Sequence, residues 1–470
     1  MSAKETRPRA GSRIALVLCV LLLMVIAAWL PTMIFKGGGD AGATLPPPYS
    51  TALIARGEYL AKVGDCAACH TSQGGKPFAG GLPVQSPIGV IYSSNITPDP
   101  QTGIGKYTYG EFERAVRRGV NHAGNTLYPA MPYPSYARVS GQDVQALYAY
   151  FMKGVQPVSQ PNRKNGIPWP LSLRWPLAYW RWVFSPGVPE VTVSSGSAPA
   201  GQGTDLIARG AYLVEGLGHC GACHTPRSVT MQEEALTPLD GPSYLAGSEV
   251  DNWVAPSLRG NAADGLAGMS QDELVALLRS GRNTNSAVFG GMSDVVHHST
   301  QYMTDADLAA VAAFLKSLTV PGDEKKLTYN PSISNDLYKG DVRMPGAQLY
   351  VDNCATCHRT TGHGYDQAFP ALALNPVVNS TNPDSLIHIV LTGSTMPGTK
   401  TAPTEFSMPS FASRLTDDDV AQLLTFVRSS WGNTAPAVTK EQVRKIREQM
   451  PKSSNATMTD YDPRNRTEPQ

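Results

Sequence analysis

The sequence lacks an excess of charge of either sign: 39 Lys and Arg balance 38 Asp and Glu among its 470 residues, for a formal net charge of +1. Proteins that bind nucleic acid through its phosphates carry a concentrated basic patch, and the central part of the chain has none. A nucleic-acid partner is therefore disfavoured. The length allows about three domains of ordinary size.

Cysteine is also scarce, with seven in the whole chain, and outside an early apolar run none is spare. The other six form three Cys-x-x-Cys pairs, each followed at once by histidine. A chain of this composition would contain about 0.002 such motifs by chance, so three copies require a function. The motifs are Cys66-Ala-Ala-Cys69-His70, Cys220-Gly-Ala-Cys223-His224 and Cys354-Ala-Thr-Cys357-His358.

The lack of further cysteines and of strand patterns weighs against other uses of these pairs. A structural zinc site needs a fourth ligand, which zinc ribbons take from a second cysteine pair. A disulfide exchanger carries its pair in an α/β pattern. Cys-x-x-Cys-His is the attachment signature of haem c, in which both thiols bond to the haem vinyls and the histidine ligates the iron. We therefore predict three covalent haem c groups, with His70, His224 and His358 as proximal ligands.

Residues 1–43 differ from the rest of the chain. A basic segment precedes an uncharged run over residues 14–35, a pattern typical of an export signal whose length also suits a membrane span. We predict a signal or an anchor, with the uncleaved anchor favoured. Cys19 lacks the preceding small residue of a lipoprotein site and is interpreted as a plain apolar residue. The basic flank places the remainder on the periplasmic side of the inner membrane.

Each motif belongs to a repeat of one plan. A short helix is predicted before each motif, at residues 53–63, 206–217 and 347–353, and a Gly/Pro-rich loop follows it. A second helix then closes the repeat, with an [ST]-x-x-[DE] start whose hydroxyl caps free N–H groups. The predicted N-caps are Ser140, Thr304 and Thr416, and an aromatic recurs near each helix end, at Phe151, Phe314 and Phe426.

This pattern predicts a mainly α fold: three tandem cytochrome c-like helical haem domains with long irregular loops, plus an N-terminal apolar helix. The expected boundaries are 44–160 for domain 1, 161–203 for a Trp/Pro-rich connector ending in a linker over 194–203, 204–322 for domain 2, 340–434 for domain 3 and 435–470 for a charged tail. The tail is expected to hold a short helix near 441–450 and to be otherwise disordered. The three domain ranges are called repeats 1, 2 and 3 below.

A methionine precedes each closing helix by 8 to 12 residues, at Met131, Met292 and Met408. Methionine opposite histidine fills both axial positions of the iron, which suits electron transfer. We predict these three as sixth ligands, with Met396 as the alternative to Met408.

Histidines are the other alternative for the sixth position. His122, His297 and His298 could each supply a nitrogen, but we expect them to be surface residues. A proline in each loop, namely Pro98, Pro256 or Pro370, could accept the second N–H of the proximal ring through its carbonyl, or could simply form a turn.

The connector concentrates four of the seven tryptophans, Trp169, Trp175, Trp180 and Trp182, with two arginines, Arg174 and Arg181. Aromatic residues with arginine are typical both of binding hot spots and of bilayer interfaces. Three interpretations stay open: packing between domains, contact with a catalytic subunit, and contact with the membrane.

From residue 56 to 433 the chain resembles the triple-haem cytochrome c subunits of membrane-bound dehydrogenases, of the quinoprotein alcohol type and the flavoprotein gluconate, sorbitol and fructose types. The similarity includes Gly-Asp-Cys-Ala-Ala-Cys-His-Thr at 64–71, Leu-Tyr-Pro-Ala-Met-Pro-Tyr at 127–133 and Cys-Gly-Ala-Cys-His-Thr-Pro-Arg at 220–227. The resemblance implies that a quinone- or flavin-containing catalytic subunit oxidises a CH–OH donor and passes electrons through this chain to ubiquinone. The chain would then have no substrate site and no catalytic residue of its own.

Two other functions are weighed against this one. A free-standing or oxidase-linked multihaem carrier would share the same motifs. A haem enzyme such as a peroxidase needs one iron with an open sixth position, and the methionine in every repeat argues against it.

Overall fold

The computed structural model describes residues 16–26, 49–189, 204–250, 252–260, 265–266, 268–318 and 327–450. In these residues short helices alternate with long loops, and strands form only two-stranded antiparallel hairpins, as the mainly α prediction expects. The strands are β1 (Pro83–Val84), β2 (Ile91–Tyr92), β3 (Ser248–Val250), β4 (Trp253–Ala255), β5 (Ser394–Thr395) and β6 (Ser407–Met408).

The helices follow the repeat plan. Repeat 1 holds α2 (Thr51–Val63), α3 (Cys66–His70), α4 (Tyr109–Arg118), α5 (Tyr133–Tyr136) and α6 (Gly141–Lys153), and the connector holds α7 (Trp175–Phe184). Repeat 2 holds α8 (Thr204–Ala211), η1 (Tyr212–Leu217), α9 (Gly221–His224), η2 (Pro238–Asp240), α10 (Gln271–Ser280), α11 (Gly291–His298), η3 (Thr300–Tyr302) and α12 (Asp305–Ser317). Repeat 3 and the tail hold α13 (Ser332–Tyr338), α14 (Ala347–Asn353), α15 (Ala355–His358), α16 (Pro376–Asn379), α17 (Asp384–Thr392), α18 (Asp417–Ser429) and α19 (Lys440–Gln449).

In every repeat the helix before the motif packs across the closing helix, as α2 on α6, α8 on α12 and α14 on α18. A glycine lies at each crossing: a Cβ added to Gly57, Gly210 or Gly346 would lie 1.9, 2.0 or 2.3 Å from a carbonyl oxygen of the partner helix. Only a residue without a side chain allows this approach. The three glycines therefore set how closely the two helices of each repeat pack.

The same contact corrects the prediction that Phe151, Phe314 and Phe426 occupy equivalent positions in the three repeats. The aromatic Cβ atoms nearest to the three glycines belong to Tyr150, Phe314 and Phe426, each ten residues after its N-cap. Tyr150, and not Phe151, is thus the counterpart in repeat 1. Phe151 instead packs edge-on against Phe78, with ring centroids 5.3 Å apart.

The three N-caps are confirmed. The hydroxyls of Ser140, Thr304 and Thr416 each accept a 3.2 Å hydrogen bond from the backbone N–H three residues later. Each of those residues is an aspartate, whose charge favours the positive end of the helix.

The helix predicted over 206–217 changes type part-way. It starts as α8 and continues as the π-helix η1. The first cysteine follows the crossing glycine by 9 positions in repeat 1 (57 to 66) and by 10 in repeat 2 (210 to 220). A π-turn accommodates one extra residue in a helix. Because of η1, Gly210 can lie at the helix crossing while Cys220 starts the second motif, as Gly57 and Cys66 do in repeat 1.

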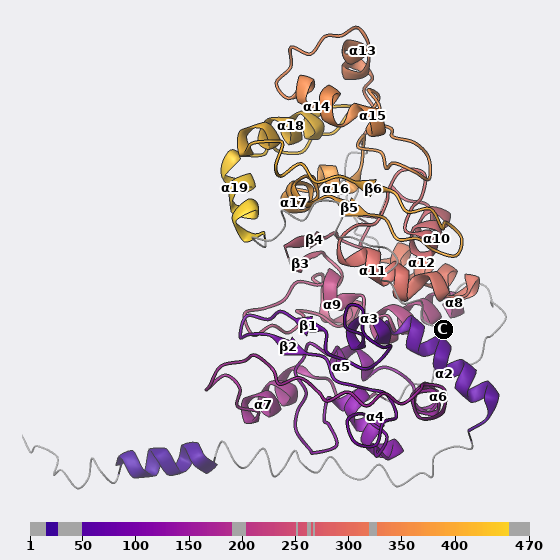
Figure 1. The fold of residues 1–470 in the computed structure, drawn as a ribbon, viewed down its shortest axis with the longest axis vertical. Helices are drawn as coiled ribbons and strands as arrows, with labels where there is room; N and C mark the ends of the chain where they lie inside the picture. The colour runs from indigo at the N-terminus through magenta and orange to yellow at the C-terminus, as the bar shows by residue number, and fades with distance from the viewer. Residues whose placement is uncertain are drawn as a thin grey trace, which may run out of the picture.

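Repeats 1 and 2 share one hydrophobic core, which includes Leu60 and Leu147 of the first and Leu213 and Phe314 of the second. Repeat 3 has its own core around Ile387 and Trp431, and Figure 1 shows it at one end of the long axis of the molecule.

The disorder expected in the tail outside its short helix is contradicted at residues 435–440, where Val438 is buried in the core of repeat 3. Val443 and Ile446 of α19 are buried in the core of repeat 3, because they lie on one face of an amphipathic helix that packs on α17 and α18. The helix expected near 441–450 is confirmed as α19. Residues 451–470 lie outside the described part of the chain.

The structure describes only part of the predicted N-terminal signal or anchor. Within the apolar run the structure describes a helix over residues 16–26, and no described helix is long and apolar enough to cross a membrane. The rest of residues 1–43, like the predicted linker over 194–203, lies outside the described residues.

Candidate haem-binding sites

The three motif histidines make the same second contact. Nδ1 of His70 lies 2.7 Å from the carbonyl oxygen of Ser94, Nδ1 of His224 lies 2.8 Å from that of Pro256, and Nδ1 of His358 lies 2.9 Å from that of Pro370. A carbonyl only accepts, so each Nδ1 carries the hydrogen and each Nε2 keeps its lone pair. Nε2 is therefore the nitrogen that can ligate iron.

Two of the three predicted proline carbonyls are thus the observed acceptors. Pro98 is not: in repeat 1 the loop brings the carbonyl of Ser94 to His70. Burial lowers the pKa of all three rings. Their neutral form, which is the form that binds a metal, is therefore favoured.

The cysteine pairs fit thioether attachment better than zinc or disulfide chemistry. None of the six motif cysteines is paired in a disulfide. Burial raises the pKa of Cys66, Cys220 and Cys354 to about 12 and that of Cys69 to about 11. A zinc ligand or an exchange nucleophile must be a thiolate. In addition, the described residues contain no cluster of three or more His, Cys, Asp or Glu side chains that could hold a metal ion.

The predicted methionine ligands lie on different kinds of element. Met131 packs against the shared core of repeats 1 and 2. Met408 lies on β6 and packs against the core of repeat 3. The β5–β6 hairpin also carries Met396, whose N–H donates to Phe406 at 2.9 Å, so both candidates of repeat 3 are on one hairpin. Met292 lies in the first turn of α11, which contacts α3 of repeat 1 as well as α10.

The competing histidines divide into two groups. His122 is exposed, and its Nδ1 lies 2.8 Å from Glu111, as expected for a surface residue. His297 and His298 are partly buried instead. Their rings meet edge-on at 4.7 Å, and Nδ1 of His297 lies 3.4 Å from the carbonyl oxygen of Gly398. The two are therefore less exposed than expected, and Gly398 in the loop of repeat 3 contacts the end of α11.

The first two motifs lie beside each other, which sequence reasoning missed. Tyr136 stacks on His219, with ring centroids 5.6 Å apart and planes 19° apart, and its hydroxyl donates to Gly64 at 3.0 Å. Gly64 and His219 precede the first and second motifs closely. Electrostatic repulsion from the Cys223 thiolate also raises the pKa of Cys69, which is an effect of short range. Groups attached at these motifs would therefore be neighbours.

Repeat 3 contacts repeat 2 through a different set of residues. Trp253 stacks on His388, with ring centroids 4.0 Å apart, and its neighbour Val254 donates to Ser385 at 2.7 Å. The buried Arg282 donates to the carbonyls of Ala402 and Thr404, both at 2.7 Å. These contacts join repeat 3 to repeat 2, although the described residues of the two repeats do not share an apolar core.

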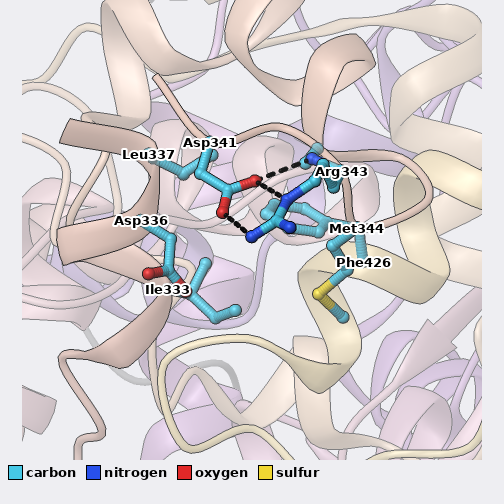
Figure 2. A pocket seen from close by; sticks show the side chains of 8 residues that line it. Ile333, Asp336, Leu337, Asp341, Arg343, Met344 and Phe426 are labelled. Carbon is cyan, nitrogen blue, oxygen red and sulfur yellow. Dashed lines mark hydrogen bonds and ion pairs between the residues drawn. The ribbon is translucent and has the colours of Figure 1, made fainter. Parts of the chain in front are cut away.

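One further hollow lies away from the motifs. A cavity of about 360 Å³ opens between α13, α14 and α18. Figure 2 shows Asp341 and Arg343 paired at its edge beside Met344 and Phe426, and the two charged groups are 2.6 Å apart. No motif residue and no predicted methionine ligand lines it. It is therefore separate from the candidate haem sites.

Comparison with known proteins matches this geometry to a family. Residues 344–431 match the cytochrome c family. Over 432 residues, 91% of this chain and 95% of the relative, the chain is 51% identical to the gluconate 2-dehydrogenase cytochrome c subunit of Pantoea cypripedii. The chain belongs to the family of dehydrogenase cytochrome c subunits.

Other relatives of this cytochrome subunit extend the family. It is 51% identical over 406 residues, 86% of each chain, to the cytochrome c subunit of quinone alcohol dehydrogenase from Gluconacetobacter polyoxogenes. It is 34% identical over 444 residues to the fructose dehydrogenase cytochrome subunit of Gluconobacter japonicus, covering 90% of this chain and 89% of that one. As a cytochrome c, the protein binds haem c covalently and serves in electron transport.

Proposed function

We propose that this cytochrome subunit transfers electrons from the catalytic subunit of a membrane-bound sugar, alcohol or aldehyde dehydrogenase to ubiquinone, on the periplasmic side of the inner membrane. The names of its relatives support a dehydrogenase donor: they are subunits of gluconate, alcohol and fructose dehydrogenases. The subunit would belong to the respiratory chain and would take no part in the substrate reaction.

The residues of the chain hold three haem c groups in this proposal, one in each repeat. The six motif cysteines would form the thioether bonds, and Nε2 of His70, His224 and His358 would ligate the iron. Met131, Met292 and Met408 would supply sulfur ligands. Bound haem provides a one-electron centre, and two axial protein ligands favour electron transfer over oxygen chemistry.

The observation that carries the proposal is the contact repeated at every motif. In each repeat a backbone carbonyl, 2.7 to 2.9 Å from Nδ1, fixes the histidine tautomer and ring orientation. Such outer-shell partners are a regular part of metal sites. One isolated contact would be weak support, but three identical contacts directly after Cys-x-x-Cys pairs favour three equivalent sites.

Haem content tests the number of sites. We expect about three haems per chain in the purified protein, measured by pyridine haemochrome absorbance against protein mass. The paired change of Cys354→Ala and Cys357→Ala should lower the content by one, and a Cys19→Ser control should leave it unchanged. A wild-type content of two or fewer would overturn the three-site assignment.

Reduction by a partner tests the direction of transfer. The complex is solubilised with its large subunit, and haem reduction is followed after addition of gluconate, ethanol or fructose, then reoxidation after a soluble ubiquinone analogue. Recovery of the chain without any quinone- or flavin-containing subunit would favour the free-standing carrier instead. Rapid carbon monoxide binding to the reduced protein would favour a haem with an open site.

A further inference from the structure

The connector between repeats 1 and 2 exposes large apolar side chains. Trp182 and Val183 of α7 are 62% and 58% exposed, and Trp169 and Leu171 of the preceding loop are 80% and 52% exposed. Trp175 and Leu173 are exposed as well. Trp175, Trp182 and Val183 follow the i, i+7, i+8 spacing of one helix face. We call these six residues the connector face.

The opposite side of α7 is fixed to the body of the protein. Trp180 donates from its indole N–H to the carbonyl of Thr230 at 2.7 Å, and its ring meets Tyr133 edge-on at 6.3 Å. Ala178 is buried. Because residues of both repeats contact one side of α7, the connector face has a fixed orientation relative to the body of the protein. Trp180 is thus packed against both repeats, whereas Trp169, Trp175 and Trp182 are exposed.

The connector carries mainly basic residues, and Glu190 is its one acidic residue. Residues 154–189 contain Arg163, Lys164, Arg174 and Arg181 and no Asp or Glu, although the whole chain is nearly neutral. Arg174 lies over the ring of Tyr128, 4.0 Å from its centroid, and donates to Thr126. Figure 1 shows α7 at the edge of the molecule, toward the end opposite repeat 3. The connector is therefore net basic, which favours attraction to an anionic surface.

We propose that the connector face inserts into the headgroup region of an anionic lipid bilayer. Tryptophan, with its apolar ring and polar N–H, concentrates at that depth. Leucine and valine add apolar area, and the exposed Arg163 and Lys164 of the connector attract anionic lipid. The net basic charge of the connector, together with its exposed tryptophans, favours an anionic lipid surface as the partner. This inference rests on the membrane location in the proposed function, and it identifies the surface of the protein that contacts the lipid.

A depth measurement at one residue tests this surface in the full-length haem-loaded protein. A nitroxide label is attached at Trp182→Cys in a Cys19→Ser background, and vesicles of phosphatidylcholine with about one-third phosphatidylglycerol are added. Electron paramagnetic resonance then compares collisions of the label with oxygen, which concentrates in lipid, and with a water-soluble nickel complex. We expect collisions with nickel to fall several-fold and those with oxygen to rise. The same label at Trp169→Cys should respond likewise.

The matched control is a label at Tyr338→Cys, which replaces an 87% exposed residue on α13. Both proteins keep the same N-terminal run, so any vesicle binding by that run is shared. Unchanged collisions at residues 182 and 169 on vesicles would overturn the proposal. Loss of access to both reagents only in the complex with the large subunit would also overturn it, in favour of a protein interface. Haem reduction by the dehydrogenase substrate, measured in the same samples, tests the proposed function separately.

Discussion

The hydroxyl of Tyr212 in repeat 2 donates a 2.6 Å hydrogen bond to the carboxylate of Asp143 in repeat 1. The contact recurs in the opposite direction, where Tyr59 of repeat 1 donates to Asp307 of repeat 2. Tyr59 and Tyr212 both lie two residues after their crossing glycines. The two repeats are thus joined by a reciprocal pair of contacts, as two copies of one surface.

An arginine completes each contact. Asp143 accepts from Arg56 at 2.8 Å, and Asp307 accepts from Arg209 at 2.8 Å, so each aspartate receives donors from both repeats. Repeat 3 has Pro345 and Gln348 at the positions of this arginine and tyrosine. It therefore lacks the groups that join the first two repeats, and it contacts the molecule through other residues.

Removal of one tyrosine hydroxyl should weaken this joint. Tyr212→Phe takes one donor from the fully buried Asp143, and an underpaired buried acceptor costs about 1–3 kcal/mol. We expect the free energy of unfolding in urea to fall by about that amount, and by more in the double change with Tyr59→Phe. Tyr338→Phe, at an exposed position, is the control. Stability within about 0.5 kcal/mol of wild type for Tyr212→Phe would contradict the role given to the hydroxyl.

Gly57→Ala should disrupt the crossing of α2 and α6. Its methyl group would lie 1.9 Å from the carbonyl of Ala146, which is backbone and cannot move aside alone. Overpacking of this kind costs about 1–3 kcal/mol or more. We expect lower thermal stability and less haem incorporated during expression. Gly110→Ala in α4 is the matched control because nothing lies within 4 Å of its added Cβ; equal behaviour of the two variants would refute the prediction.

The iron ligand of repeat 3 can be identified by removing each methionine of the β5–β6 hairpin. Met408→Ala should lower the reduction potential of one haem and abolish one methionine-ligated species in magnetic circular dichroism, because methionine ligation raises the potential. Met396→Ala should leave both measurements as in wild type. The reverse pattern would assign the ligand to Met396.

Glu233 should make stability depend on pH in the weakly acidic range. Burial raises its pKa from 4.5 to about 7, against the opposing effect of Arg227. Between these values the folded protein binds more protons than the unfolded chain, so this group lowers stability as pH rises. Relative to Glu233→Gln, wild type should thus lose stability in urea titrations from pH 4.5 to 7, then level off. Glu249→Gln, at an exposed residue of β3, should track wild type throughout; a wild-type curve parallel to Glu233→Gln would exclude the effect.

Local features were predictable because their partners lie a few residues apart. Ser140, Thr304 and Thr416 cap their helices through the backbone three residues on, so the pattern alone contains both partners. The Cys-x-x-Cys-His motifs are local in the same sense. The π-helix η1 was missed, although the extra residue before Cys220 was a visible signal.

Contacts over long sequence distances were decided by the tertiary structure alone. The acceptor of His70 proved to be Ser94, 24 residues away, and the proline rule that holds for His224 and His358 fails there. Tyr212 and Asp143 are 69 residues apart, and the connector exposes Trp182 while it holds Trp180 against Thr230. Composition and spacing by themselves predicted the chemistry of the motifs, because one short segment contains the two cysteines and the histidine that are proposed to hold each haem. The contacts between repeats depend on the path that each long loop takes and on which distant groups pair when they are buried. Both are settled only when the whole chain folds.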